Sequence, residues 1–214
     1  MILYEVGTFL SQPAAAMAQP HRVVSFTLLE RFFALFGWSS FIMPGMLIVA
    51  ILLAWHVAAN EPWWIDWRTP LLMTGESVIW GLPLLVLGRA LQLTAGVYQP
   101  DLADRIVLSI GAGIYEELLF RLIMIELLSL LLIDLVHLPR NAALVFIIML
   151  SSGAFAAHHY QPFGADVFRP VSFLFRTAAG IYLAAVYVLR GFGLAAGAHM
   201  VYDIVVVSLD ALYA

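Results

Sequence analysis

Apolar residues dominate the chain in long runs, which short polar or Pro/Gly-containing segments separate. A helix needs about 20 mostly apolar residues to cross a hydrocarbon core of about 30 Å, and six runs are about that long. The pattern therefore predicts an all-α fold, a polytopic membrane helix bundle of about six transmembrane helices. The expected spans are residues 32–58, 71–93, 106–136, 142–159, 171–189 and 192–212.

The third run is too long for a simple span. Its length, about 31 residues, corresponds to roughly 46 Å of helix at about 1.5 Å per residue, more than the hydrocarbon core. We therefore expect this helix to tilt, break or project beyond the membrane. Before the second run, Trp63, Trp64 and Trp67 lie in a polar loop and suit the boundary between membrane and water.

The first 31 residues lack the pattern of a span. No basic region precedes the first apolar residues, so a signal peptide is not indicated. Arg22, Glu30 and Arg31 stand beside apolar positions, which indicates an interfacial segment. We expect residues 1–31 to form an N-terminal tail with this interfacial segment, and residues 32–214 to form the transmembrane domain.

Composition supports a membrane protein and excludes several classes. Hydrophobic residues make up 63% of the 214 residues and charged residues 11%, and the mean hydropathy is +0.96, whereas a soluble domain is roughly 45 to 50% apolar. A net charge of −4 leaves no basic patch, so we expect the lipid bilayer and no nucleic acid as a partner. The absence of cysteine excludes disulfides, thiolate catalysis and Cys-bound zinc. We expect a multi-pass integral protein of the plasma (inner) membrane.

Three ionisable residues stand together inside the third apolar run, at Glu116, Glu117 and Arg121. An ionised side chain at bilayer depth costs roughly 2.5 to 3.5 kcal/mol on insertion scales, so such residues usually have partners and a function. Glu117 and Arg121 are four residues apart on one helix face and can form an ion pair. Glu116 points about 100° away and is left free for chemistry.

Two later runs each carry a polar stripe. Phe155 and His159 are four residues apart, as are His199 and Asp203, so each helix can present one stripe toward a common centre. A carboxylate beside a neutral imidazole at low dielectric can act as a base toward water. This set of residues therefore favours hydrolysis.

These residues, in this order, resemble the CAAX protease and bacteriocin-processing (CPBP/Abi) family of intramembrane proteases. The family pattern is EExxxR, then FxxxH, then HxxxN or HxxxD, each on its own membrane helix, and the resemblance covers about residues 111–203. It implies a CPBP-like protease domain at residues 32–214 and an intramembrane endopeptidase similar to the type II CAAX prenyl endopeptidases. The substrate would be a peptide or membrane protein.

The resemblance also implies a role for each matching residue. Glu116 would activate water with the help of His159, the second glutamate and the arginine would support them, and His199 with Asp203 would stabilise the oxyanion. Many members have Asn in place of Asp203; an ionised carboxylate cannot donate a hydrogen bond, so we expect Asp203 to orient His199. His158 is an extra imidazole beside the family position that His159 occupies. The candidate catalytic residues are Glu116, Glu117, Arg121, His159, His199 and Asp203, with His158 and Phe155 as additional candidates.

Metal dependence stays open at this stage. Catalytic zinc commonly takes three protein ligands and a water, and Glu116, His159 and His199 are the candidates here. No HExxH motif is present, and the resemblance favours a metal-free, glutamate-based mechanism. We therefore expect no cofactor, with zinc as the alternative.

Other classes of function also fit a buried polar cluster. A transporter or an ion or proton pathway could use these residues, although no internal repeat of the kind common in transporters is visible. His159 and His199 could ligate haem, but haem ligation does not require the glutamate pair. A catalytically silent scaffold is the third alternative. Proton-coupled uptake without proteolysis would favour the transporter, and a Soret band would favour haem.

Overall fold

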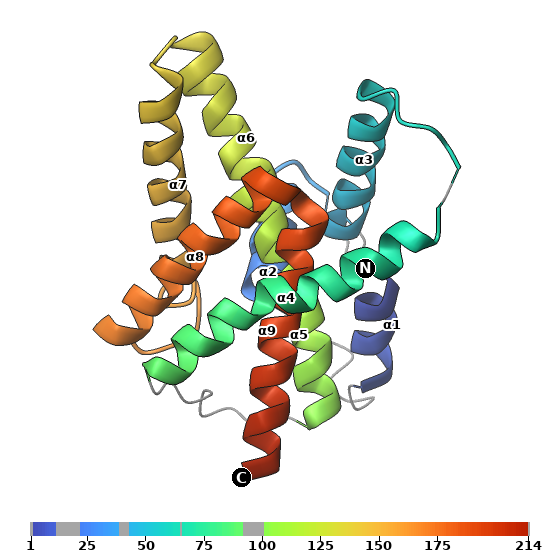
Figure 1. The fold of residues 1–214 in the computed structure, drawn as a ribbon, viewed down its shortest axis with the longest axis vertical. Helices are drawn as coiled ribbons and strands as arrows, with labels where there is room; N and C mark the ends of the chain where they lie inside the picture. Colours follow the sequence, from blue (N-terminus) through green and yellow to red (C-terminus); the bar gives the residue numbers. More distant parts are fainter. Residues whose placement is uncertain (1, 12–21, 39–42, 65, 92–100, 214) are drawn as a thin grey trace.

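The computed structural model describes residues 2–11, 22–38, 43–64, 66–91 and 101–213, and in these ranges the regular elements are all helices. Two π-helical turns, Leu118–Ile123 and Leu130–Leu135, flank α6, so the backbone from Leu102 to Leu135 forms one uninterrupted helical rod. The helices are α1 (Ile2–Ser11), α2 (Val24–Ala34), α3 (Met43–Ala58), α4 (Arg68–Ala90), α5 (Leu102–Glu117), α6 (Met124–Ser129), α7 (Arg140–Ala157), α8 (Pro170–Arg190) and α9 (Phe192–Tyr213) (Figure 1).

The predicted polytopic helical bundle is confirmed. By length and composition, α4, α7, α8 and α9 can each cross a membrane, and α3 is a shorter apolar helix. The rod built from α5 and α6 contains all but the last residue of the third predicted span, residues 106–136, and the two π-helical turns interrupt its α-helical geometry. The protein is therefore a multi-pass integral membrane protein.

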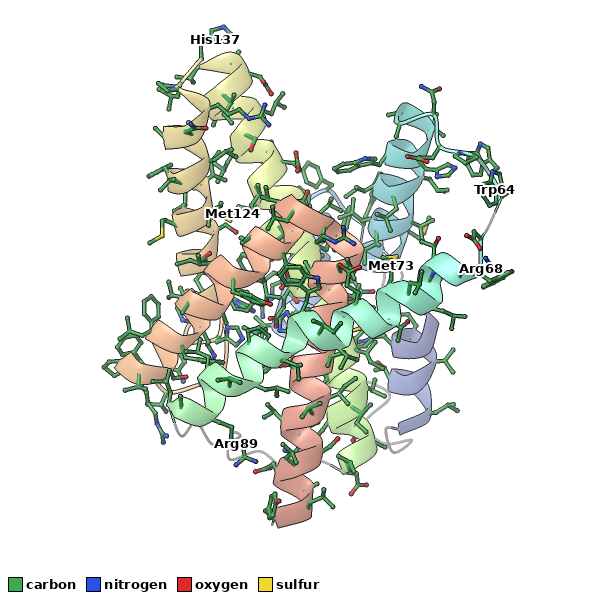
Figure 2. The ribbon with its side chains drawn as sticks, in the orientation of Figure 1. Trp64, Arg68, Met73, Arg89, Met124 and His137 are labelled. Atoms are coloured by element: carbon green, nitrogen blue, oxygen red, sulfur yellow. The ribbon has the colours of Figure 1, made fainter. Side chains whose placement is uncertain are left out.

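The surface of these helices carries the side chains that lipid contact requires. Leu71, Ile79 and Val86 on α4 are each more than half exposed, which in water would form a large apolar patch. Figure 2 shows Trp64 and Arg68 at one end of α4 and Arg89 at its other end. Tryptophan and arginine at the ends of an apolar helix are typical of the boundary between membrane and water.

The centre of the bundle is a pair of closely packed helices. α5 and α9 lie side by side, α4 packs across α9, and α7 packs against α8 (Figure 1). Glycine permits the closest approaches: a Cβ added at Gly113 of α5 would lie 2.8 Å from the Ala196 carbonyl oxygen of α9, and one at Gly81 of α4 would lie 3.2 Å from the Ala198 carbonyl oxygen. Small residues at helix contacts let backbones approach in this way.

The N-terminal residues differ from the expected tail. Residues 2–11 form α1, which packs against α5 and buries Tyr4 completely. The Tyr4 ring meets the Tyr115 ring of α5 edge-on, with centroids 5.4 Å apart, and sits over Gly111, where a Cβ would collide with it. The Tyr115 hydroxyl donates a hydrogen bond of 2.9 Å to Glu5 of α1. Because Tyr115 directly precedes Glu116, α1 braces the part of α5 that carries the glutamate pair.

The expected interfacial segment is also partly internal. It forms α2, whose Phe26 and Leu29 are buried, and the Phe26 ring packs edge-on against Tyr115 at 5.0 Å. Arg22 precedes α2, pairs with Glu5 at 2.8 Å and lies over the Phe26 ring. These contacts tie α1 and α2 to α5. The division of the chain at residue 32 stays a prediction.

The close approach of α5 and α9 predicts a clear effect of Gly113→Ala. The new methyl group would overlap the backbone of α9, which cannot rotate away, and such overpacking typically costs about 1 to 3 kcal/mol. We expect a lower midpoint of thermal unfolding in detergent. Gly153→Ala on α7 is the matched control, because a Cβ there meets nothing within 4 Å. Equal midpoints for the two variants would contradict the packing described.

Candidate active site

A cavity of about 540 Å³ lies between α4, α5, α8 and α9, and the polar motif residues line one part of it. Glu116 comes from α5, His159 is the second residue after the end of α7, and His199 and Asp203 come from α9. The apolar part of the wall comes from α4, α8 and α9 and includes Leu84, Phe175, Leu183 and Val206. Segments that are far apart in the sequence thus meet at one site, as the sequence analysis expected.

Glu117 lies at the centre of a fully buried charge network. One carboxylate oxygen is 3.1 Å from Nε of Arg121, and both side chains are 0% exposed. The other oxygen is 2.8 Å from Nδ1 of His199 on α9. Burying charges is costly unless each one finds partners, and here one carboxylate serves both an arginine and a histidine. The predicted Glu117–Arg121 contact is present, and the Glu117–His199 contact adds the link between α5 and α9.

Arg121 extends this network to the next two helices. Its Nη2 donates a hydrogen bond of 3.2 Å to the Gly180 carbonyl of α8, and its guanidinium carbon lies 4.4 Å from the centre of the Phe155 ring of α7. A Cβ at Gly180 would press on Ser152 of α7, so glycine permits this close approach. Phe155 therefore acts as a platform for the buried cation.

The π-helical turn after Glu117 places Arg121 for these contacts. Single π-helical turns inside α-helices occur often at functional sites. In this one, Ser151 of α7 donates a hydrogen bond of 2.6 Å to the carbonyl of Phe120. A side chain from α7 thus satisfies a backbone acceptor of the widened turn, which fixes the turn against its neighbour.

Glu116 lies among three imidazoles. One of its carboxylate oxygens is 3.3 Å from Nε2 of His158, and the other is 3.9 Å from Nε2 of His159 and 3.9 Å from Nε2 of His199. Its side chain is 7% exposed, and the second oxygen has no hydrogen-bond partner among the described residues. An unpartnered carboxylate oxygen beside a cavity is a natural acceptor for a proton from water.

The two adjacent histidines differ in their access to the cavity. His159 lines the cavity and its side chain is 23% exposed, whereas His158 is 4% exposed and lies behind Glu116, against the Phe120 ring. The Phe155 carbonyl accepts from Nδ1 of both rings, at 2.5 Å and 2.9 Å. Both Nε2 atoms are therefore turned toward Glu116.

His199 is held mainly by Glu117 rather than by Asp203. Its Nδ1 is 2.8 Å from Glu117, while its Nε2 is 3.5 Å from Asp203. Both partners are carboxylates, which accept when ionised, so both ring nitrogens of His199 face acceptors, an environment that favours the doubly protonated, positively charged ring. The expectation that Asp203 orients His199 stays a prediction, and the structure adds Glu117 as the nearer partner.

Some residues that line the cavity lie outside the sequence motifs. Leu84 and Gly88 of α4 line the cavity, as do Phe175 and Arg176 of α8, and all four lie outside the three motifs. Arg176 pairs with Asp166 at 2.5 Å, so its charge already has a partner. These residues line the cavity because α4 and α8 pack against α9, and that packing cannot be read from the sequence.

The structure also offers a group of metal donors. Glu116, His158 and His159 each present one donor atom, and these atoms all lie within 4.8 Å of one another. This set differs from the expected candidates, because it contains His158 in place of His199. Nδ1 of His199 instead faces Glu117.

Breaking the buried ion pair should destabilise the protein strongly. In Arg121→Met the Glu117 carboxylate loses its guanidinium, and removing one partner of a buried pair typically costs about 3 to 5 kcal/mol. The double variant Glu117→Gln/Arg121→Met should regain much of this stability, because both members of the ion pair are gone and His199 keeps Asp203 as a carboxylate partner. Reversible unfolding in mixed micelles would measure both. A loss no larger than that of Arg190→Met, which breaks the more exposed Arg190–Glu76 pair, would contradict the described network.

Comparison with known proteins agrees with the motifs and the site. The family model described as type II CAAX prenyl endopeptidase Rce1-like matches residues 98–205, which include the glutamate pair, both later stripes and most of α9. No curated protein and no solved structure matches the chain. Since the family model covers half of the sequence, the chain belongs to the Rce1-like family of type II CAAX prenyl endopeptidases.

Proposed function

We propose that this protein is an intramembrane endopeptidase that hydrolyses a peptide bond with a water molecule activated by Glu116 and His159. The observation that carries the proposal is the meeting of Glu116, His159, His199 and Asp203 in one cavity inside a membrane helix bundle. Family membership supports the same class of reaction. The substrate is a peptide or a membrane protein.

In this proposal each residue of the site has a task in hydrolysis. A water beside Glu116 transfers a proton to the unpartnered carboxylate oxygen, while the water oxygen attacks the carbonyl carbon of the scissile bond. The carbonyl oxygen becomes an oxyanion, and the positively charged imidazole of His199, which lies nearby, stabilises the negative charge. Glu116 then passes the proton to the departing amine nitrogen as the carbon–nitrogen bond breaks. The products are a carboxylic acid and an amine, with no covalent intermediate on the enzyme.

His159 and Asp203 act around this proton transfer. His159 lies on the cavity side of Glu116 and can hold the water through its ring. Asp203 lies beside His199 on the cavity wall and helps to keep it protonated. Glu117 and Arg121 keep Glu116 and His199 in position. Both side chains are 0% exposed, so they do not contact the substrate.

The position of the cavity indicates how a substrate arrives. α4 and α8 form two of its walls, and both carry exposed apolar side chains on their outer faces, including Leu82, Val86 and Leu174. A substrate anchored in the bilayer can therefore approach between helices that themselves face lipid. The proposal places the enzyme in the plasma (inner) membrane.

Glu116→Gln should abolish proteolysis while leaving the fold intact. Glutamine keeps the shape of the side chain but cannot take up the proton, and the loss of a general base typically costs about 10² to 10⁴ in rate. The assay is cleavage of a membrane-anchored peptide library by purified protein in detergent, read by mass spectrometry. Glu126→Gln is the matched control: Glu126 lies further along the same rod, outside the cavity, and accepts a hydrogen bond from Tyr187 that glutamine can also accept.

The outcomes separate the proposal from its alternatives. Cleavage by wild type and Glu126→Gln, but not by Glu116→Gln, supports the proposal. Equal cleavage by all three proteins would reject Glu116 as the activating residue. Proton-coupled uptake into vesicles without any cleavage would reject the endopeptidase and favour a transporter.

A further inference from the structure

A second cavity lies apart from the candidate active site, between α3, the part of the rod that contains α6, α7 and the end of α8. Its volume is about 760 Å³, within the roughly 300 to 1,000 Å³ of sites that hold small molecules. The two cavities share no lining residue. The proposed peptide hydrolysis therefore does not use the second cavity.

The second cavity exists because α3 packs against the bundle through its first half only. Pro44, Gly45 and Ile48 in that half are buried. In the second half, Leu52 and Trp55 are 41% and 51% exposed, although both line the second cavity. The main helix neighbour of α3 is α2, and no described helix fills the space between the second half of α3 and the rod. Lipid tails are as apolar as leucine, so lipid is the material that the bilayer offers to fill it.

The lining of the second cavity changes from apolar to charged along the rod. Leu122 and Ile125 line it near the middle of the rod, and Asp134 lines it at the end of the rod. Asp134 follows Ile125 by nine residues, which is about 14 Å of helix at about 1.5 Å per residue. Arg140 begins α7 and Glu61 follows α3, and Figure 1 shows these helix ends at the same end of the molecule as the end of the rod. An amphiphile with an apolar chain and a charged headgroup matches this gradient.

The charged end of the second cavity lies at the boundary between membrane and water. Trp63 and Trp64, which follow Glu61 closely, are 70% and 71% exposed, and tryptophan is typical of that boundary. The Trp63 ring meets the ring of His56 edge-on, with centroids 4.4 Å apart. His56 lines the second cavity, and its Nε2 is cut off from solvent without a hydrogen-bond partner among the described residues. A headgroup oxygen at this position would give the ring a partner.

The charges at this end indicate which headgroup fits. Glu61 and Asp134 are acidic and Arg140 is basic, and none of the three belongs to an ion pair in the part of the chain that the structure describes. Glu126 also lines the second cavity, but it already accepts a hydrogen bond of 2.6 Å from the hydroxyl of Tyr187. A complementary headgroup carries one anion for the guanidinium and one cation with N–H donors for the two carboxylates.

We infer that the second cavity binds one phospholipid whose zwitterionic headgroup carries a primary ammonium group, as in phosphatidylethanolamine. Arg140 binds the phosphate, whose oxygens match the guanidinium fork. Glu61 and Asp134 accept hydrogen bonds from the ammonium group, and an acyl chain lies along Leu122 and Ile125. The bound lipid fills the space beside the second half of α3 and joins that helix to the rod.

Other membrane lipids fit this set of groups less well. Phosphatidylglycerol brings a net negative charge to an end that already holds two carboxylates, which repel it. Phosphatidylcholine has a cation without N–H groups, so it donates no hydrogen bond to the carboxylates. Free phosphoethanolamine has the right headgroup but no acyl chain, and it loses the apolar contact with the rod.

The test is native mass spectrometry of the full chain, purified in detergent, freed of lipid and titrated with lipids that carry identical acyl chains. We expect one phosphatidylethanolamine per chain, bound at least about tenfold more tightly than phosphatidylcholine or phosphatidylglycerol, since a hydrogen bond to a charged group is worth about that factor. Free phosphoethanolamine should not displace the lipid.

Two sets of variants separate the roles of the headgroup contacts. Arg140→Gln should weaken the binding of phosphatidylethanolamine and phosphatidylcholine alike, by about tenfold, because both carry the phosphate. Arg68→Gln is the matched control, since Arg68 is also exposed, begins α4 and lies outside the second cavity. Glu61→Gln/Asp134→Asn should instead remove the preference for phosphatidylethanolamine over phosphatidylcholine.

A variant that keeps every charge tests the apolar part of the second cavity. Leu144 of α7 lines it, so Leu144→Trp should occupy the space of the acyl chain and lower the affinity for phosphatidylethanolamine by about tenfold or more. Val145→Trp is the control, because Val145 is 65% exposed and lies outside the second cavity. This control should bind the lipid like wild type.

Four results would overturn the inference. The first is equal affinity of wild type for phosphatidylethanolamine and phosphatidylglycerol, and the second is displacement of the lipid by free phosphoethanolamine. The third is wild-type lipid affinity in Arg140→Gln or Leu144→Trp. The fourth is a lipid-free dimer, which would show that a second copy of the chain covers the second cavity. None of these results bears on peptide cleavage, so the proposed function is tested separately.

Discussion

The rest of the structure depends on the contacts that the buried carboxylate of Glu117 makes. It contacts Arg121 on one side and His199 on the other, and Arg121 carries the connection to the Gly180 carbonyl of α8. In a membrane helix bundle, helices gain little from burying apolar surface against one another, because lipid tails are as apolar as the side chains. A network of paired charges and hydrogen bonds therefore specifies how α5, α8 and α9 meet. Because Glu116 directly precedes Glu117 in the chain, the same network also fixes where Glu116 lies.

Much of this arrangement could be predicted from the sequence, because the signals are local. Long apolar runs indicate membrane helices, and helical spacing places Glu117 beside Arg121 and brings each later stripe to one face. The order of the three motifs then indicates the family. The contact of Glu117 with His199 had no such signal, since the residues are 82 positions apart. The π-helical turn and the hydrogen bond to the Gly180 carbonyl could not be predicted either, because residue types do not reveal backbone geometry or which backbone carbonyl accepts a hydrogen bond.

The N-terminal segment shows the same limit more strongly. Residues 2–11 are too short and too mixed in character to predict more than a tail, and Tyr115, the partner on α5 that Tyr4 and Glu5 share, lies more than a hundred positions away. Their contacts with Tyr115 lie outside the three motifs. Two distant parts of the chain thus meet at the residue before Glu116, so the bracing of the glutamate pair begins outside the region that the family model covers.

The central claim is that water held at Glu116 cleaves the substrate directly, and isotope labelling tests it most directly. A membrane-anchored peptide that the protein cleaves would be incubated in H₂¹⁸O with hydroxylamine present, and the new C-terminus would be weighed by mass spectrometry. We predict a carboxylate with one ¹⁸O and no hydroxamate, formed by wild type and not by Glu116→Gln. Hydroxamate in the product would reveal an acyl-enzyme and contradict the account, as would labelled product from Glu116→Gln at the wild-type rate.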